Sequence, residues 1–169
     1  AIQTTLDRGT VLDDVGDALE NGQLGPWLQP QISTNTGTVS GMEALARWIH
    51  PEKGVIPPAE FLTAIEENGL IERLGEIILY HSFKALQTWD KAGFKVPTIS
   101  VNFSATELSN PKLVDKIRWE LDRFEFDPAR LTVEILENVI ASSDNDTITR
   151  NIAALSQLGC GIDLDDFGT

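Results

Sequence analysis

The chain has 169 residues, a hydrophobic fraction of 41%, a charged fraction of 23% and a formal net charge of -13. This length and composition are typical of one soluble globular domain with its own core. The acidic balance argues against binding of DNA or RNA polymers, which requires a basic surface, and it favours metal cations over a lysine cluster for handling an anionic substrate.

The cysteine content points to a reducing compartment. Cys160 is the only cysteine, so an intrachain disulfide is excluded, and its apolar surroundings favour a buried thiol over a reactive one. No apolar run approaches the roughly 20 residues of a membrane span, and no signal peptide is visible. We therefore predict a cytoplasmic location without direct membrane contact, or the soluble domain of a larger membrane-bound protein.

The first part of the chain predicts a linker, a short helix and a hairpin. Residues 1–10 are polar and weakly patterned, as in a linker, and apolar residues at helical spacing follow until Asn21-Gly22. Two strands, Trp27 to Ile32 and Val39 to Trp48, flank a turn signal at Asn35-Thr36-Gly37. So short a connection predicts that these two strands are antiparallel.

Helices and strands then alternate to the end of the chain. The predicted helices begin near Pro57-Pro58, near Ile71, at Asn110-Pro111 and at Ser143 or Asp144, and the predicted strands are Thr98 to Phe103, Leu131 to Leu136 and Gly161 to Asp165. Such alternation indicates an α/β fold of parallel strands joined by helical crossovers. The five strands would form either about half of an eight-stranded (β/α)8 barrel or a complete open sheet.

Side-chain alternation separates an apolar and a polar face on these strands. One parity of each strand carries apolar residues for the covering helices, whereas the other carries polar side chains near the C-terminal end of the strand. These polar residues are Glu43 and Arg47, Asn102, Glu134, and Asp163 with Asp165.

The polar residues predict a metal centre. Burying three carboxylates and an amide in one place is costly unless a cation holds them. The all-oxygen set of Glu43, Asn102, Glu134 and Asp165 suits Mg²⁺ or Mn²⁺ rather than zinc, and Asp166 could help to hold a second ion with Asp165 as the bridge. Two such ions are a common arrangement for attack of hydroxide on phosphorus.

The segment that follows the last predicted strand is typical of an active-site loop. The adjacent carboxylates Asp165 and Asp166 precede Phe167-Gly168 at the C-terminal end of that strand, where α/β barrels and open α/β sheets carry their chemistry. We therefore expect the chain to be part of a larger functional unit.

A series of motifs in order resembles the EAL family of bacterial cyclic di-GMP phosphodiesterases. The resemblance covers roughly residues 11–169, which we interpret as the N-terminal portion of such a domain. Its motifs are Gln29-Pro30, Glu43-Ala44-Leu45-Ala46-Arg47-Trp48 with His50-Pro51, Pro57-Pro58 with Phe61, Val101-Asn102-Phe103-Ser104, Glu134-Ile135-Leu136-Glu137 and Asp165-Asp166-Phe167-Gly168-Thr169.

The resemblance implies a fold and a set of functional residues. The fold would be a TIM-like barrel with an antiparallel first strand, of which this chain holds about the first five strands. The implied catalytic residues are Glu43, Asp165 and Asp166; the implied metal ligands are Glu43, Asn102, Glu134, Asp165 and Asp166; the implied substrate-binding residues are Gln29, Leu45 and Arg47; and Glu137 would anchor the loop that begins at Asp165.

Two positions depart from the family pattern. Leu136 replaces a commoner threonine, which we interpret as a packing change. Asp163 stands where a small residue is usual and adds a negative charge on the ligand parity. Glu66 matches an acidic position of the family, although an exposed helix residue is an equally good interpretation of it.

The resemblance implies a metal-dependent hydrolysis of cyclic di-GMP to the linear dinucleotide pGpG by the complete domain, with two Mg²⁺ or Mn²⁺ ions. It also implies a homodimer and an upstream sensor or GGDEF domain. Two alternatives stay open: a receptor that binds cyclic di-GMP without cleaving it, and a regulatory half-barrel. We expect residues 1–169 in isolation to have little or no activity, because part of the implied site is missing.

Overall fold

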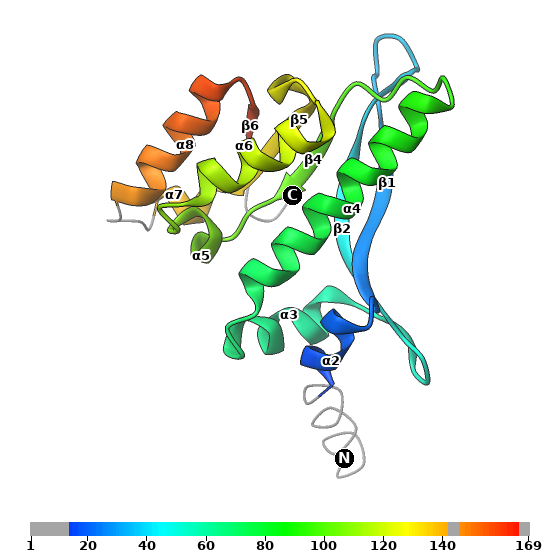
Figure 1. Ribbon diagram of the computed structural model, residues 1–169, viewed down its shortest axis with the longest axis vertical. Helices are drawn as coiled ribbons and strands as arrows, with labels where there is room; N and C mark the ends of the chain where they lie inside the picture. The colour runs from blue at the N-terminus through cyan, green and yellow to red at the C-terminus, as the bar shows by residue number, and fades with distance from the viewer. Residues whose placement is uncertain (1–13, 142–145, 166–169) are drawn as a thin grey trace.

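The computed structural model describes residues 14–141 and 146–165. They form an α/β structure in which one mixed sheet carries helices α4, α6 and α8 side by side over one face (Figure 1). The strands are β1 (Leu24–Ile32), β2 (Val39–His50), β3 (Gly54–Ile56), β4 (Ile99–Asn102), β5 (Leu131–Leu136) and β6 (Gly161–Asp165). The α-helices are α2 (Val15–Glu20), α3 (Pro58–Glu67), α4 (Ile71–Lys91), α5 (Ala105–Leu108), α6 (Leu113–Phe124), α7 (Glu137–Ala141) and α8 (Asp146–Leu158).

The sheet order is β1-β2-β4-β5-β6, with the short β3 paired to β2. Strands β1 and β2 are antiparallel, and the pairs β2–β4, β4–β5 and β5–β6 are all parallel. The predicted hairpin and the predicted helical crossovers are therefore confirmed. The parallel arrangement matters for function, because it brings the C-terminal ends of β2, β4, β5 and β6 to the same edge of the sheet.

Several boundaries differ from the sequence-based prediction. Strand β1 begins at Leu24, three residues before the predicted start at Trp27. Pro26 lies inside the strand, because a proline is tolerated in an edge strand. Helix α6 begins at Leu113 rather than at Asn110, because the Asn110 side chain accepts a hydrogen bond from the amide of Lys112 at 2.9 Å and forms a turn there.

The short elements β3 and α5 were not predicted from hydrophobic periodicity. Three or four residues are too few to establish a period of 2.0 or 3.6. The predicted cap of the last helix at Ser143 or Asp144 lies outside the described residues, which resume at the first residue of α8, Asp146.

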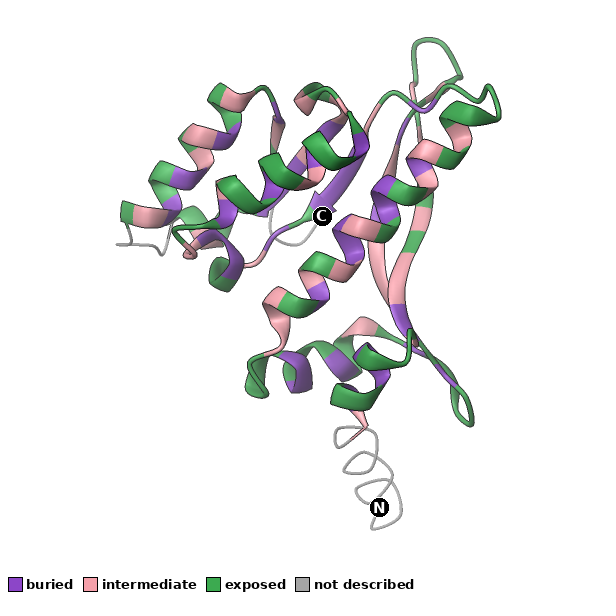
Figure 2. Cartoon of the chain, viewed as in Figure 1, coloured by how far each residue is buried: buried purple, intermediate pink, exposed green. Residues whose placement is uncertain are grey.

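The core lies between the helices and the apolar face of the sheet, and Figure 2 shows buried residues concentrated on the inward sides of α4, α6 and α8. The prediction of an apolar face is confirmed in β4 and β5, where the side chains of that face are buried: Ile99, Val101, Leu131, Val133 and Ile135. On α4, Leu74, Ile78, Phe83 and Leu86 follow the helical period and are buried too. No helix of the described residues is long and apolar enough to cross a lipid bilayer.

Cys160 is buried, as predicted, between α8 and β6. Desolvation by burial raises the pKa of its thiol to about 11. Because the thiolate is the nucleophile, a thiol that is both inaccessible and hard to ionise is unreactive at neutral pH. Cys160 therefore belongs to the packing of the fold rather than to its chemistry.

Trp48 connects β2 to helix α3 in the core. The tryptophan is fully buried, and its ring meets Phe61 of α3 edge to face with 6.0 Å between ring centroids. Its indole Nε1 donates a hydrogen bond to Gln23 Oε1 at 3.1 Å, so the polar atom is satisfied in the interior. This side chain both fills the core and orients the strand that carries Glu43.

We predict that Trp48→Ala lowers the free energy of unfolding by about 3–5 kcal/mol, because the substitution leaves a large cavity and an unpaired Gln23 side chain. Trp119→Ala is the matched control: Trp119 is 62% exposed and contacts Arg123 through a cation–π interaction, worth about 1 kcal/mol or less. Equilibrium urea unfolding measures both changes. A loss for Trp48→Ala no larger than that for Trp119→Ala would contradict the prediction.

Candidate functional site

Strand register places the predicted ligands on one face of the sheet. Paired residues on neighbouring strands point to the same side, and so do residues two apart on one strand. Glu43 of β2 pairs with Ser100 of β4, and Asn102 pairs with Glu134 of β5. Because the intervening Val101 is buried in the core, this common face is the one opposite the helices.

Strand β6 extends the same face. Asp163 pairs with Glu134, and Asp165 pairs with Leu136, which lies two residues beyond Glu134. Glu43, Glu134, Asp163 and Asp165 are therefore four carboxylates on one side of three strands. Asn102 adds an amide between the strands of Glu43 and Glu134, and its side chain is exposed on this face.

Of these four carboxylates, Glu134 has the surroundings that most disfavour its charged form. It is only 4% exposed, and its Oε2 has no hydrogen-bond partner among the residues that the structure describes. Burial, together with the negative charges of Glu43, Asp165 and Asp163, raises the pKa of Glu134 to about 7. A buried carboxylate that faces three like charges is unfavourable unless a proton or a cation neutralises it.

The donor chemistry of this face fits a hard divalent cation. The available atoms are carboxylate and amide oxygens, which Mg²⁺ and Mn²⁺ prefer, and the unpartnered Oε2 of Glu134 is a free donor among them. Within the described ranges, however, no group of three or more His, Cys, Asp or Glu residues converges closely enough to bind a metal ion. Asp166, which is predicted to bind the second ion together with Asp165, lies outside those ranges. The full ligand set therefore stays a prediction.

The predicted substrate residues lie beside the carboxylates on β1 and β2. Gln29 pairs with Glu43, and Leu45 pairs with Trp27, so all four share the polar face. Arg47 follows Leu45 by two residues, and its guanidinium lies over the Trp27 ring at 4.8 Å from the ring centroid. Stacking on an indole restricts a guanidinium while leaving its N–H groups able to bind an anion.

A pocket of about 350 Å³ joins part of this set to the helices α3 and α4. Leu45, Asn102 and Glu134 line it together, whereas Gln29, Glu43 and Arg47 do not. A larger groove of about 800 Å³ lies between α4 and α6 and is lined by none of the predicted ligands. The chemistry on the sheet face identifies the smaller pocket as the one that belongs to the candidate site.

Glu137 and Glu66 are the remaining residues that the family resemblance selected. Glu137 is the first residue of α7 and is exposed, but the loop that it was expected to anchor begins at the last described residue, Asp165. That role stays a prediction. Glu66 is exposed on helix α3, whereas the carboxylates of the site lie on strands of the sheet.

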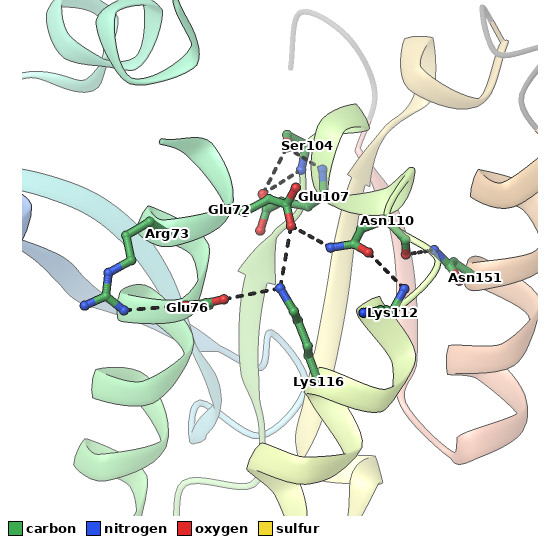
Figure 3. A network of polar contacts seen from close by, with 9 residues as sticks. All are labelled: Glu72, Arg73, Glu76, Ser104, Glu107, Asn110, Lys112, Lys116 and Asn151. Carbon is green, nitrogen blue, oxygen red and sulfur yellow. Dashed lines mark hydrogen bonds and ion pairs between the residues drawn. The ribbon is translucent and has the colours of Figure 1, made fainter. Parts of the chain in front are cut away.

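The prediction from sequence missed one buried acidic residue beside the site, Glu107 of α5. Its carboxyl group accepts hydrogen bonds from Ser104 (Figure 3). Glu107 also lines the same pocket as Asn102 and Glu134. Desolvation by burial raises the pKa of Glu107 to about 7. The pattern Ser104-Ala105-Thr106-Glu107 is a helix capping box, and this signal could have located it.

We predict that the cation-free protein becomes less stable as the pH rises from 4.5 through about 7. The folded state keeps protons on Glu134 and Glu107 that the unfolded chain releases at its lower pKa, so the stabilisation is complete below the unfolded pKa and is lost through the folded one. Mg²⁺ or Mn²⁺ should restore stability most strongly above that range, because the cation binds the ionised carboxylates.

Urea unfolding at a series of pH values, with and without the cation, measures this effect. Glu134→Gln and Glu107→Gln should each flatten the pH dependence, whereas Glu67→Gln, at an exposed position of α3, should leave it unchanged. An identical slope for wild type and Glu134→Gln would contradict the assignment of the buried proton.

Sequence comparison relates the chain to proteins of cyclic di-GMP signalling. The bifunctional diguanylate cyclase/cyclic di-GMP phosphodiesterase MucR of Pseudomonas aeruginosa is 38% identical over 159 residues, which are 94% of this chain and 23% of MucR. The cyclic di-GMP phosphodiesterase PdeR of Escherichia coli is 36% identical, over 90% of this chain and 22% of PdeR. The chain thus spans less than a quarter of the length of these two relatives.

Structural comparison supports the fold as well. The structure of the MucR phosphodiesterase in complex with c-di-GMP superposes with a TM-score of 0.86 at 38% identity, covering 95% of this chain and 64% of that one. The EAL domain of FimX from Xanthomonas citri shares the fold with a TM-score of 0.79 at 18% identity. The EAL domain model matches residues 12–169, which is most of the chain, and the chain therefore belongs to the EAL domain family of cyclic di-GMP phosphodiesterases.

Proposed function

We propose that the complete protein hydrolyses cyclic di-GMP to linear pGpG in a divalent-metal-dependent reaction of bacterial signalling. The observation that carries the proposal is Glu134: a buried carboxylate with an unpartnered oxygen, next to three other carboxylates on the face where the parallel strands end. A cation would neutralise such a site, and a cation at a strand-end site is suited to phosphodiester chemistry. The similarity to MucR and PdeR, both named as cyclic di-GMP phosphodiesterases, supports cyclic di-GMP as the proposed substrate.

In this proposal Glu43, Asn102, Glu134 and Asp165 hold one ion, and Asp165 and Asp166 hold the second. When bound, such ions lower the pKa of water and offset negative charge on the phosphate. The protein itself contributes the orientation of the first ion's ligands, since Glu43, Asn102, Glu134 and Asp165 each come from a different strand of the sheet. Asp163 adds a fourth carboxylate, which increases the demand of this face for positive charge.

Arg47, Gln29 and Leu45 are proposed to bind the substrate. Arg47 would hold a phosphate with its guanidinium, whose orientation Trp27 restricts by stacking. Leu45 offers an apolar contact in the pocket shared with Asn102 and Glu134, and Gln29 offers an amide next to Glu43. Together they would place the scissile phosphate beside the carboxylates.

The competing proposal is a receptor that binds cyclic di-GMP without cleaving it. It is favoured by the spacing of the carboxylates, because no three of those that the structure describes converge into a metal-binding group. Retention of Glu43, Glu134 and Asp165 favours the enzyme, since a receptor has no need of metal ligands. Product formation separates the two proposals directly.

For the complete protein we further propose a cytoplasmic location, a homodimer and regulation by an upstream sensor or GGDEF domain. The relatives MucR and PdeR are several times longer than the matched segment, which leaves room for such domains in them. In the dimer, Glu137 is proposed to anchor the loop that begins at Asp165.

We predict that the full-length protein with Mg²⁺ or Mn²⁺ converts cyclic di-GMP to the linear dinucleotide, and that Glu43→Ala reduces turnover by at least about a hundredfold. Loss of groups that merely support metal ligands costs about 10–100-fold, so loss of a ligand should cost more. Chromatography of the nucleotide products gives the rate, and Glu67→Ala, at an exposed position of α3, is the control that should keep full activity.

Two results would contradict this proposal. Binding of cyclic di-GMP without any linear product, with either cation, would establish the receptor instead. Undiminished turnover by Glu43→Ala would refute the metal assignment even if the wild-type protein is an enzyme.

A further inference from the structure

The turn after β4 is closed by a buried capping box. Ser104 Oγ accepts a hydrogen bond from the amide of Glu107 at 3.2 Å, and Glu107 Oε1 accepts from the amide and the hydroxyl of Ser104 at 3.1 and 3.0 Å. Capping boxes are usually exposed to water, but Glu107 is only 8% exposed. A four-residue helix such as α5 gains little from so costly a burial of a carboxyl group, which suggests a role beyond the helix itself.

Helix α4 is shaped to receive this carboxyl group. Glu107 lies against Gly75 of α4, where a Cβ atom would collide with Glu107 Oε2. Glycine inside a helix costs about 0.5–1 kcal/mol relative to alanine, and at this position the missing Cβ atom lets the Glu107 carboxyl group sit against the helix without having to shift. The contact between Gly75 and Glu107 places α5 against the N-terminal part of α4.

The other end of α5 is fixed by α8 and α4 (Figure 3). Asn151 of α8 donates from Nδ2 to the carbonyl oxygens of Leu108 and Asn110, both at 2.8 Å. Asn110 in turn donates from its side chain to Glu72 of α4 at 2.6 Å. Hydrogen bonds at both ends of α5 therefore restrict the segment from Ser104 to Asn110.

This connection begins at Asn102, the amide ligand proposed for the metal site. Ser104 follows Asn102 by two residues, and the amide of the intervening Phe103 donates to the carbonyl oxygen of Glu134 at 3.0 Å. Gly75, Ser104 and Glu107 line the same pocket as Asn102 and Glu134. The backbone that follows Asn102 is thus held at Phe103 by β5 and at Ser104 by the capping box.

We propose that Glu107 is a positioning residue of the metal site: through Ser104, and seated in the notch that Gly75 leaves in α4, it holds Asn102 in register with Glu134. Glu107 touches neither substrate nor cation in this scheme. The proposal rests on the proposed function in one respect, namely that Asn102 is a metal ligand.

The test measures Mn²⁺ affinity of the full-length protein by electron paramagnetic resonance in the absence of substrate. Glu107→Ala is expected to weaken binding by about 10–100-fold, the range seen for groups that orient metal ligands. Glu107→Gln, which keeps the shape and the acceptor oxygen of the cap, is expected to stay within about threefold of wild type. Lys116→Ala is the control, because it breaks the ion pairs that join α6 to Glu72 and Glu76 of α4 and removes no atom of the capping box.

Gly75→Ala tests the same proposal from the α4 side, because the added methyl group would displace the Glu107 carboxyl group. It should weaken Mn²⁺ binding as Glu107→Ala does, and in the Glu107→Ala background it should add no further loss, since the group that it displaces is gone. Equal affinities of wild type, Glu107→Ala and Gly75→Ala would overturn the proposal. So would an equal loss in Glu107→Gln and Glu107→Ala.

Hydrogen exchange of the cation-free protein separates this proposal from the proposed function. Glu107→Ala and Gly75→Ala should speed exchange of the Phe103 and Ser104 amides, whereas Glu107→Gln and Lys116→Ala should not. If the wild-type protein binds no Mn²⁺, the metal-dependent function fails and the exchange rates alone decide whether Glu107 positions Asn102. Unchanged exchange at these two amides would overturn the positioning role.

Discussion

The parallel register of β2, β4, β5 and β6 is the constraint on which the candidate site depends. Because side chains alternate between faces, a slip of one residue between β4 and β5 would turn Glu134 into the helix-covered core and bring Val133 to the polar face. The burial of Val101 and Val133 under the helices therefore fixes the orientation of Asn102 and Glu134. Hydrophobic packing on one face of the sheet determines the geometry of the charged groups on the other.

The same arrangement places stability and function in opposition. Four carboxylates on one face repel each other, and the pKa of Glu134 near 7 reflects the cost of ionising it there. The core offsets this cost through residues such as Trp48 and the apolar face of α4. A divalent cation would turn the repulsion into attraction, so the destabilising feature of the isolated fold is the one on which the proposed metal site rests.

Polar interactions on the helix side of the sheet tie α5 to its neighbours. Asn110 and Asn151 connect α4, α8 and the end of α5 through short hydrogen bonds that are buried or partly buried, and Glu107 closes the capping box at the start of α5. Because buried polar groups are costly when unpaired, such a network holds one arrangement of the β4–α5 connection and excludes others. In the proposed scheme, contacts within the helical layer thereby position the Asn102 side chain on the opposite face of the sheet.

By itself, the sequence determined the α/β class, the antiparallel hairpin, the core parity and the polar residues at the strand ends, because periodicity and turn signals are local properties of the chain. The EAL motifs added the family. Only the tertiary structure decided which strands are neighbours, that Glu134 is buried with an unpartnered oxygen, and that Arg47 lies on Trp27. It also decided that Gly75 of α4 makes room for Glu107, a contact between residues 32 positions apart. Such facts depend on the packing of segments far apart in the chain, which no local pattern encodes.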